Sequence, residues 1–128
     1  MTSISDPALV SYLRSTPLEK RKAISRKIIT SYPGFVPVIV GRGETKVTPS
    51  IKKNKFLAPS NITLGKFLGI IRLHVETTHP HDPISFFVSS SSSIPVNSMF
   101  MQQVHEKYKS EDGFLYVSYV SENTFGSL

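Results

Sequence analysis

The sequence predicts an α+β fold in which a mixed sheet packs around a central helix. Local patterns follow one another in the order helix, helix, strand, strand, helix, strand, helix, strand, which is typical of this class. The clearest apolar period of the chain, from Leu64 to Val75, supplies the central helix. With 128 residues the chain is about one domain long, which is enough to bury one continuous core.

Two helices are predicted before the first strand. Asp6-Pro7 can cap and start a short helix from Ala8 to Arg14. The next start is stronger, because Thr16-Pro17-Leu18-Glu19 has the spacing of a capping box and places proline in the first turn, where its missing N–H costs nothing. We expect that helix to run from Pro17 to about Ser31 and to end at Pro33-Gly34.

Two strands follow, separated by a polar loop. The β-branched run from Phe35 to Val40 predicts a buried strand, provided that Pro37 lies where the sheet needs no donor. Residues Gly41 to Asn54 are polar and contain glycine and proline, so they predict a loop that could begin as an extension of the first strand. Lys55 to Ala58 is the second strand.

The central helix has a well-defined start and apolar face. Thr63 is placed to cap its N-terminus. Apolar residues then recur at the spacing of one helix face, namely Leu64, Phe67, Leu68, Ile71 and Val75. Pro80 and Pro83 close this region, and Ile84 to Val88 is expected to be the third strand.

The rest of the chain is predicted to contain a loop, a helix and a strand. The serine run from Ser89 to Ser93 is a loop, and Ser98 can cap a helix from Met99 to Lys109. Ser110 to Gly113 turns the chain, and Phe114 to Val120 forms the final strand.

Cysteine is absent from the sequence. Disulfide frameworks, thiolate metal sites and catalytic thiols are therefore excluded, and a reducing compartment is expected. No stretch approaches the length of a membrane span, and the N-terminus lacks the pattern of a signal peptide. We therefore expect a soluble, intracellular protein.

Positive charge is concentrated in the first half of the chain. The formal net charge is +6, and the basic residues cluster at Arg14, Lys20, Arg21, Lys22, Arg26, Lys27, Lys52, Lys53 and Lys55. Such a field favours anionic partners, namely acidic peptides, lipid headgroups or nucleic acid. Aromatic residues of the kind that stack on bases are sparse here, and a solvated helix face explains the same pattern as well.

Residue patterns for catalysis or metal binding are weak. The serines stand in no G-x-S-x-G elbow, and Gly41-Arg42-Gly43 lacks the lysine and hydroxyl residue of a phosphate-binding loop. The histidines have no clear metal-ligand spacing: His74, His79, His81 and His105. We predict a protein that is not an enzyme and has neither a metal site nor a cofactor.

The segment from Glu122 to Leu128 has the features of a conjugation handle. Gly126 follows the last predicted strand at a short distance, with Ser127 and Leu128 behind it. Because glycine lacks a Cβ, the backbone can pass through a narrow enzyme channel, and a terminal glycine carboxylate is what a modifier presents to conjugating enzymes. The alternative is a flexible end without a function, since chain termini tolerate change.

Short blocks of sequence, in order from about Pro17 to Gly126, carry a family resemblance. These blocks are Pro17-Leu18-Glu19-Lys20-Arg21-Lys22, Tyr32-Pro33, Val36-Pro37-Val38-Ile39-Val40, Lys55-Phe56-Leu57-Ala58-Pro59-Ser60, Thr63-Leu64-Gly65-Lys66-Phe67, Ile70-Ile71-Arg72, Glu111-Asp112-Gly113-Phe114-Leu115-Tyr116 and Glu122-Asn123-Thr124-Phe125-Gly126. Together they resemble the autophagy-related protein 8 family of ubiquitin-like modifiers, which includes the GABA-A receptor-associated protein and the microtubule-associated light chain.

The resemblance implies a ubiquitin-like β-grasp with two additional N-terminal helices. The single domain, 1–128, would divide into a helical extension (1–33), a core (35–120) and a flexible tail (121–128). It also implies a processing cysteine protease that cuts between Gly126 and Ser127, and activating and conjugating enzymes that join Gly126 to phosphatidylethanolamine. The protein would be cytoplasmic, and on the autophagosome membrane when lipidated, where it serves membrane expansion and recruits cargo adapters.

The resemblance further implies a docking site for short adapter motifs. An aromatic and an aliphatic residue of an extended peptide enter two pockets while the peptide pairs with the edge of the Lys55 to Ala58 strand. Matching positions for the first pocket are Ile28, Pro37, Ile39, Lys55, Leu57 and Phe114, and for the second Phe56, Ala58, Pro59, Ile62, Phe67 and Ile70. Lys53 and Lys55 would meet acidic residues beside the motif. A simpler role for most of these apolar side chains is to fill the core.

The chain departs from the family pattern near the first pocket. Ile24 and Arg26 stand where members usually carry acidic residues, and Gly34-Phe35 stands where an Asp-Arg pair is usual, so the motif preference is expected to shift or weaken. Two other functions stay open. One is a modifier joined to protein, which usually lacks a trimmed extension; the other is a basic module for nucleic acid or anionic surfaces. The lipid-modifier reading expects no nucleic-acid partner.

Overall fold

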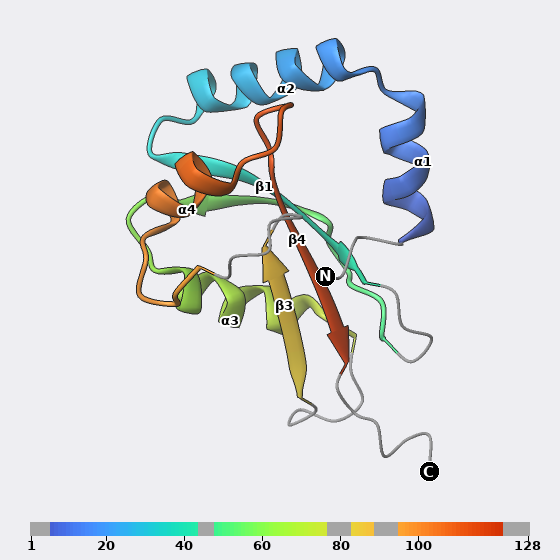
Figure 1. Cartoon of the computed structure of the whole chain (residues 1–128), viewed down its shortest axis with the longest axis vertical. Helices are drawn as coiled ribbons and strands as arrows, with labels where there is room; N and C mark the ends of the chain where they lie inside the picture. Colours follow the sequence, from blue (N-terminus) through green and yellow to red (C-terminus); the bar gives the residue numbers. More distant parts are fainter. Residues whose placement is uncertain (1–5, 44–47, 77–82, 89–94, 122–128) are drawn as a thin grey trace.

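A computed structural model describes residues 6–43, 48–76, 83–88 and 95–121 of the chain (Figure 1). Within these ranges the order of helices and strands is the order predicted from the sequence. The elements are α1 (Pro7–Ser15), α2 (Leu18–Ser31), β1 (Phe35–Arg42), β2 (Lys55–Pro59), α3 (Leu64–His74), β3 (Ile84–Val88), α4 (Met101–Tyr108) and β4 (Leu115–Ser121).

The strands form one mixed sheet in the order β2-β1-β4-β3. β1 pairs in parallel with β4 and antiparallel with β2, and β3 pairs antiparallel with β4. β1 and β4 therefore lie side by side at the centre of the sheet, and β2 and β3 are its edges. A mixed sheet with helices packed on it confirms the predicted α+β class.

Helices cover both faces of the sheet (Figure 1). On one face, α3 and α4 pack against the main apolar core, whose fully buried members include Val38, Leu64, Ile71, Met101, Val104, Leu115 and Val117. On the other face, α1 and α2 cover a smaller cluster, formed by Leu9, Ile39 and Phe114 with Ile24, Ile28 and Tyr116 packed against it. Removal of these apolar surfaces from water holds the layers together.

β1 is buried along most of its length because helices lie on both of its faces. Pro37 fits within it for a geometric reason. The N–H of Val40 bonds to the carbonyl of Asn54. The backbone N–H and C=O groups of even-numbered residues in β1 therefore point toward β2, and the backbone of residue 37 points toward β4. Pairing between β1 and β4 begins only at Val38. The sheet therefore requires no donor at Pro37, which is the condition under which a strand was predicted here.

The capping box predicted at the start of α2 is not formed. Pro17 is the N-cap residue, and its carbonyl accepts the first helical bond from the N–H of Arg21 at 3.0 Å. A capping box pairs the N-cap residue with the third residue of the helix, here Pro17 with Lys20. Thr16 and Glu19 each stand one residue before these positions, so they cannot form the box. Thr16 is instead buried, and its carbonyl accepts a bond from the Arg21 side chain.

The predicted cap of α3 is confirmed. The Oγ1 atom of Thr63 accepts a bond from the N–H of Lys66 at 3.2 Å. The predicted apolar face is the buried one, since Leu64, Phe67, Ile71 and Val75 are at most 5% exposed and Leu68 packs against the core.

The predicted start of α4 at Met99, behind a Ser98 cap, is wrong. The chain before α4 pairs with the chain before α3, through the bond from the Leu64 N–H to the carbonyl of Met99. This pairing keeps Phe100 extended, so the helix begins at Met101. Phe100 is its N-cap residue, with its N–H bonded to the Gln103 side chain.

Some predictions fall on residues outside the described ranges. These are the Ser89 to Ser93 loop, two of the histidines, His79 and His81, and the tail with Gly126 and Ser127. In the part of the chain that the structure describes, no helix has the length and apolar character that a membrane span requires.

Candidate docking site along the β2 edge

β2 is an edge strand with one unpaired side. The N–H of Ser60 bonds to the carbonyl of Gly34, so β2 joins β1 through backbone groups of its even-numbered residues. Backbone groups of Lys55 and Leu57 therefore point away from the sheet. An edge of this kind can pair with an extended peptide.

Side chains of β2 alternate between the two faces of the sheet. Lys55 and Leu57 are exposed, whereas Phe56 and Ala58 are buried. The exposed pair lies opposite Ile39 and Pro37 of β1, on the α2 side, and the buried pair joins the core beneath α3. The edge thus has one group of apolar residues on each side, which is the arrangement that the two predicted pockets require.

The first predicted set comes together between α2 and the sheet. Ile28, Ile39 and Phe114 share the cluster under the N-terminal helices, and Pro37 and Leu57 form a cross-strand pair. Leu57 is 39% exposed, so its side chain is available at the surface. The cluster also contains Leu9, Ile24 and Tyr116, which are not among the predicted pocket residues. The i, i+3 spacing of Leu9 and Tyr12 was a usable signal for an apolar face of α1.

The second predicted set lies mainly in the core beneath α3. Phe56, Ala58 and Phe67 are almost fully buried, and the Phe56 and Phe67 rings meet edge to face at 5.9 Å. Ile62 packs against this core, and Ile70 is half-buried on α3. Pro59 differs from the other members of the second set. It pairs with Phe35, and the alternation of side chains along β2 places it on the same face of the sheet as Leu57, at the border of the first set.

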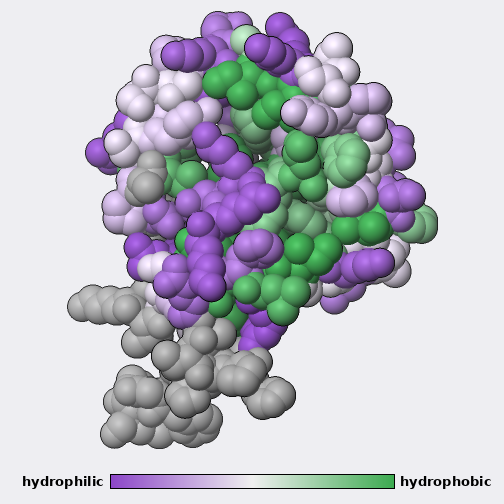
Figure 2. All heavy atoms as spheres, turned by 180° about the vertical axis from the view of Figure 1, so that it is seen from behind, coloured by the Kyte–Doolittle hydropathy of each residue, from purple (hydrophilic) through white to green (hydrophobic). Residues whose placement is uncertain are grey.

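Figure 1 has β3 toward the viewer, so the view from behind in Figure 2 looks on the β2 side of the sheet. Apolar residues gather there in separate areas, with hydrophilic residues between and beside them. A peptide lying along β2 would meet surfaces of both kinds.

Two lysines at the start of β2 lie over aromatic rings. The Nζ atom of Lys55 lies 4.8 Å from the ring centre of Tyr12, and that of Lys53 lies 5.0 Å from the ring centre of Phe56. These cation–π contacts hold the ammonium groups near the edge strand. The contact with Tyr12 joins residues 43 positions apart, so no local pattern predicts it.

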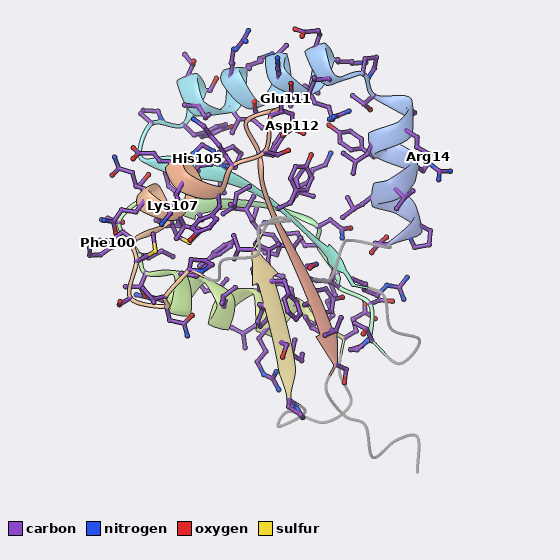
Figure 3. The ribbon with its side chains drawn as sticks, viewed as in Figure 1. Arg14, Phe100, His105, Lys107, Glu111 and Asp112 are labelled. Atoms are coloured by element: carbon purple, nitrogen blue, oxygen red, sulfur yellow. The ribbon has the colours of Figure 1, made fainter. Side chains whose placement is uncertain are left out.

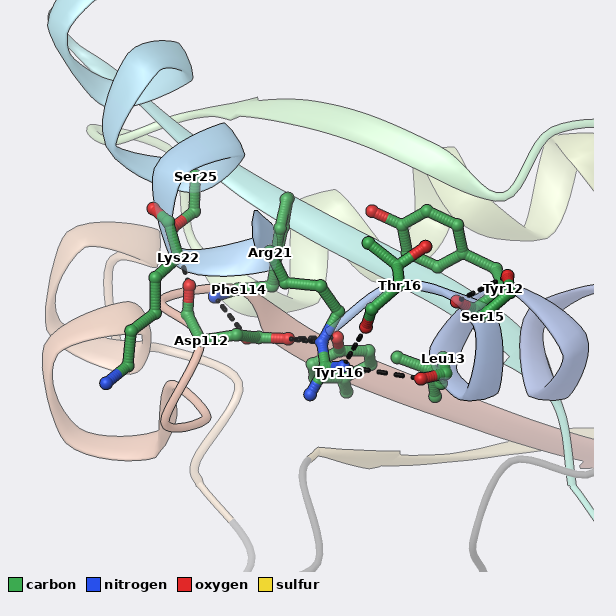
Figure 4. A network of polar contacts seen from close by, with 10 residues as sticks. All are labelled: Tyr12, Leu13, Ser15, Thr16, Arg21, Lys22, Ser25, Asp112, Phe114 and Tyr116. Carbon is green, nitrogen blue, oxygen red and sulfur yellow. Dashed lines mark hydrogen bonds and ion pairs between the residues drawn. The ribbon is translucent and has the colours of Figure 1, made fainter. Parts of the chain in front are cut away.

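A polar network fixes α1 and α2 relative to the sheet (Figure 4). Asp112, only 2% exposed, accepts bonds from Arg21 Nε at 3.1 Å, from the Tyr116 hydroxyl, and from the N–H of Phe114 at 2.9 Å. Arg21 also donates to the carbonyl oxygens of Leu13 and Thr16, between the two N-terminal helices. Burial and the bond to Asp112 raise the pKa of Tyr116, which is therefore a neutral donor.

The turn before β4 also contacts α2 directly. The Ser25 hydroxyl donates to the Asp112 carbonyl at 2.5 Å. Gly113 has φ +91°, and a Cβ there would lie 2.5 Å from Ser25 Oγ, so both the backbone and the space require glycine.

His105 joins α4 to the same turn (Figure 3). Its Nε2 lies 2.8 Å from the Gly113 carbonyl oxygen, which can only accept, so Nε2 carries the proton. Burial lowers the pKa of His105, although the bond to Gly113 opposes this effect. The ring is therefore neutral near pH 7 and has a structural role.

The described residues contain no group of three or more His, Asp or Glu side chains that could hold a metal ion. A hollow lies between the β2–α3 turn and the outer side of α4, and is lined by Ser60, Asn61, Phe100, Gln102, Gln103 and Glu106. The chemistry of the β2 edge is that of binding: unpaired backbone groups, apolar side chains and ammonium groups.

Comparison with known proteins decides the family. A family model described as autophagy protein Atg8, ubiquitin-like, matches residues 20–126. The chain belongs to the Atg8 family. Autophagy-related protein 8 of Dictyostelium discoideum is 40% identical over 117 residues, which cover 91% of this chain and 94% of that protein. The Mycosarcoma maydis protein of the same name is 42% identical over 110 residues, covering 86% and 91%.

Solved Atg8 structures have the same fold. Trypanosoma brucei ATG8 superposes with a TM-score of 0.72 at 30% identity, covering 87% of this chain and 93% of that one. Plasmodium falciparum Atg8, solved in complex with a Plasmodium falciparum Atg3 peptide, also has a TM-score of 0.72, at 32% identity, covering 84% and 95%. The ubiquitin-like fold with N-terminal helices is thereby confirmed. Atg8 proteins are ubiquitin-like modifiers and adapters rather than enzymes.

Proposed function

We propose that this chain is a lipid-conjugated modifier of autophagy. A processing cysteine protease cuts between Gly126 and Ser127, and activating and conjugating enzymes then join the Gly126 carboxyl group to phosphatidylethanolamine. Support comes from membership of the Atg8 family and from the family match, which extends to residue 126. In the sequence, Gly126 stands five positions after Ser121, where β4 ends.

Lipid conjugation has a clear physical consequence. A single acyl chain anchors a protein only marginally, whereas a lipid with two chains gives a stable attachment. Conjugation would therefore move the chain from the cytoplasm to the autophagosome membrane, where it acts in membrane expansion. A conjugating-enzyme partner is supported by the Plasmodium falciparum relative, which was solved with an Atg3 peptide.

We further propose that the β2 edge docks adapter proteins through an aromatic-x-x-aliphatic motif. The observation that carries this proposal is an edge strand whose exposed side chains face one apolar cluster and whose buried side chains face another. Backbone pairing would supply affinity, and side-chain pockets on the two sides would supply selectivity. Lys53 and Lys55 would attract acidic residues beside the motif.

The docking proposal is tested by removing one pocket wall and one charge. The double variant Leu57→Ala/Lys55→Ala should weaken binding of an acidic aromatic-x-x-aliphatic peptide by about 1–3 kcal/mol in calorimetric titration. The control is Val96→Ala/Lys107→Ala, which removes an exposed apolar residue and a lysine elsewhere. The docking assignment is wrong if the β2 double variant binds the peptide as tightly as the control does. It is also wrong if the peptide changes no NMR chemical shift of β2 residues.

The conjugation proposal is tested at its glycine. Gly126→Ala should abolish the lipid-bound form in cells while leaving the fold intact, because the enzymes must thread and activate this residue. Gly69→Ala is the control, since a Cβ at this α3 position meets nothing within 4 Å. A lipid-bound Gly126→Ala protein at the wild-type level would rule out Gly126 as the donor.

A chain that never carries lipid would favour one of two other functions. A modifier joined to protein would appear as conjugates of higher mass. A basic binding module, suggested by the net charge of +6, would bind anionic surfaces with a strong and uniform salt dependence and would tolerate deletion of residues 125–128.

A further inference from the structure

The β2 edge has two chemically different ends. At the start of the strand, Lys53 and Lys55 are exposed, and within the described residues neither ammonium group has a carboxylate within 4.0 Å. Both groups rest on aromatic rings instead. In the part of the chain that the structure describes, no carboxylate therefore neutralises the charge of these two groups.

The chain segments that form the other end of the edge carry no charge. Residues 28–41, from α2 into β1, contain no Asp, Glu, Lys, Arg or His, and neither do residues 56–65, from β2 into α3. Both segments border the edge near Pro59, where β2 pairs with the start of β1. A carboxylate placed here would lose water without gaining a cationic partner.

An aromatic residue is exposed at this uncharged end. Phe35 is 40% exposed, and it lies diagonally across the β1–β2 ladder from Leu57, which is 39% exposed. Diagonal neighbours on one face of a sheet are within reach of aromatic side chains. Phe35 and Leu57, with the half-buried Ile28 of α2 on the same side, thus form an apolar strip that continues beyond the first predicted set.

We propose that Phe35 is a specificity-determining residue of the docking edge, and that it selects partners with a bulky apolar residue at the Pro59 end. The occupant is an extended peptide paired with β2, with carboxylates beside Lys53 and Lys55 at one end and an uncharged, bulky flank on Phe35 and Leu57 at the other. This inference rests on the proposed docking function. It adds the strip beyond the two pockets and assigns the selective role to Phe35.

The experiment uses one acidic aromatic-x-x-aliphatic peptide in two versions. The acidic residues stand on one side of the motif, so the other flank reaches the Pro59 end; this flank carries either Leu or Glu. Wild-type protein should bind the Leu peptide about tenfold more tightly than the Glu peptide, because the side chain is partly buried on the strip. Phe35→Arg should reverse this preference, and Phe35→Leu should retain it.

Val96→Arg is the matched control, because it adds the same charge at a residue that is 61% exposed in a different loop. It should leave the preference for Leu over Glu unchanged. The inference is overturned if the peptides bind on β2 but the Leu-to-Glu affinity ratio is the same in wild type and Phe35→Arg, or if Val96→Arg changes the ratio equally. Absence of any peptide-induced NMR shift on β2 would instead overturn the docking function itself, and this inference with it.

Discussion

Burial of its ring makes His105 a contributor to the pH dependence of the stability of the fold. Its pKa is lowered from the ordinary value of 6.5, so the unfolded chain takes up a proton more readily than the folded one. The contribution of the neutral ring is fully present above pH 6.5 and is lost as the pH falls below that value. Protonation also places a charge in a site that is only 8% exposed.

We therefore predict that His105→Gln reduces the pH dependence of stability. When the pH is lowered from about 7.5 to 5.5, the free energy of unfolding of the wild type should fall by up to about 1 kcal/mol more than that of the variant. Urea unfolding at each pH measures this difference. Glutamine can still donate to the Gly113 carbonyl, so the variant should fold. His74→Gln, at a half-buried histidine, is the control. Equal losses in wild type and His105→Gln would contradict this role.

At the scale of elements, the Arg21–Asp112 pair joins α2 to the turn before β4. Asp112→Ala should destabilise the protein by about 3 kcal/mol, because it leaves Arg21 and Tyr116 without their common acceptor. The comparison is Lys22→Ala, which breaks the exposed i, i+3 pair with Glu19 and should cost less than about 0.5 kcal/mol. Thermal unfolding measures the stability of both variants. Similar losses of stability in Asp112→Ala and Lys22→Ala would show that the network does not hold α1 and α2 on the sheet.

The order and type of the elements could be predicted from the sequence because they depend on local periodicity. The Thr63 cap and the buried face of α3 are examples. The predicted starts of α2 and α4 were wrong for different reasons. At α2, Pro17 is the N-cap residue in place of the predicted Thr16. At α4, pairing with the chain before α3 keeps Phe100 extended. The start of α4 is decided by long-range pairing, which no short window of sequence contains.

For the whole molecule, the predicted docking residues came from the family resemblance, while the availability of the edge depends on the sheet order. Because β1 pairs with β4, β2 is left on the outside. No local pattern contains this order, nor the contact of Tyr12 with Lys55. The division of the chain at residues 33, 35, 120 and 121, and the roles of Gly126 and Ser127, stay predictions.

The central claim is that the chain ends at Gly126 in cells and is joined there to phosphatidylethanolamine. Intact mass spectrometry of the protein from its own cells, before and after induction of autophagy, tests it most directly. The account predicts a species lacking Ser127 and Leu128 and, on induction, a second species heavier by one phosphatidylethanolamine less one water. Recovery of only the full-length chain ending at Leu128 under both conditions would contradict the account.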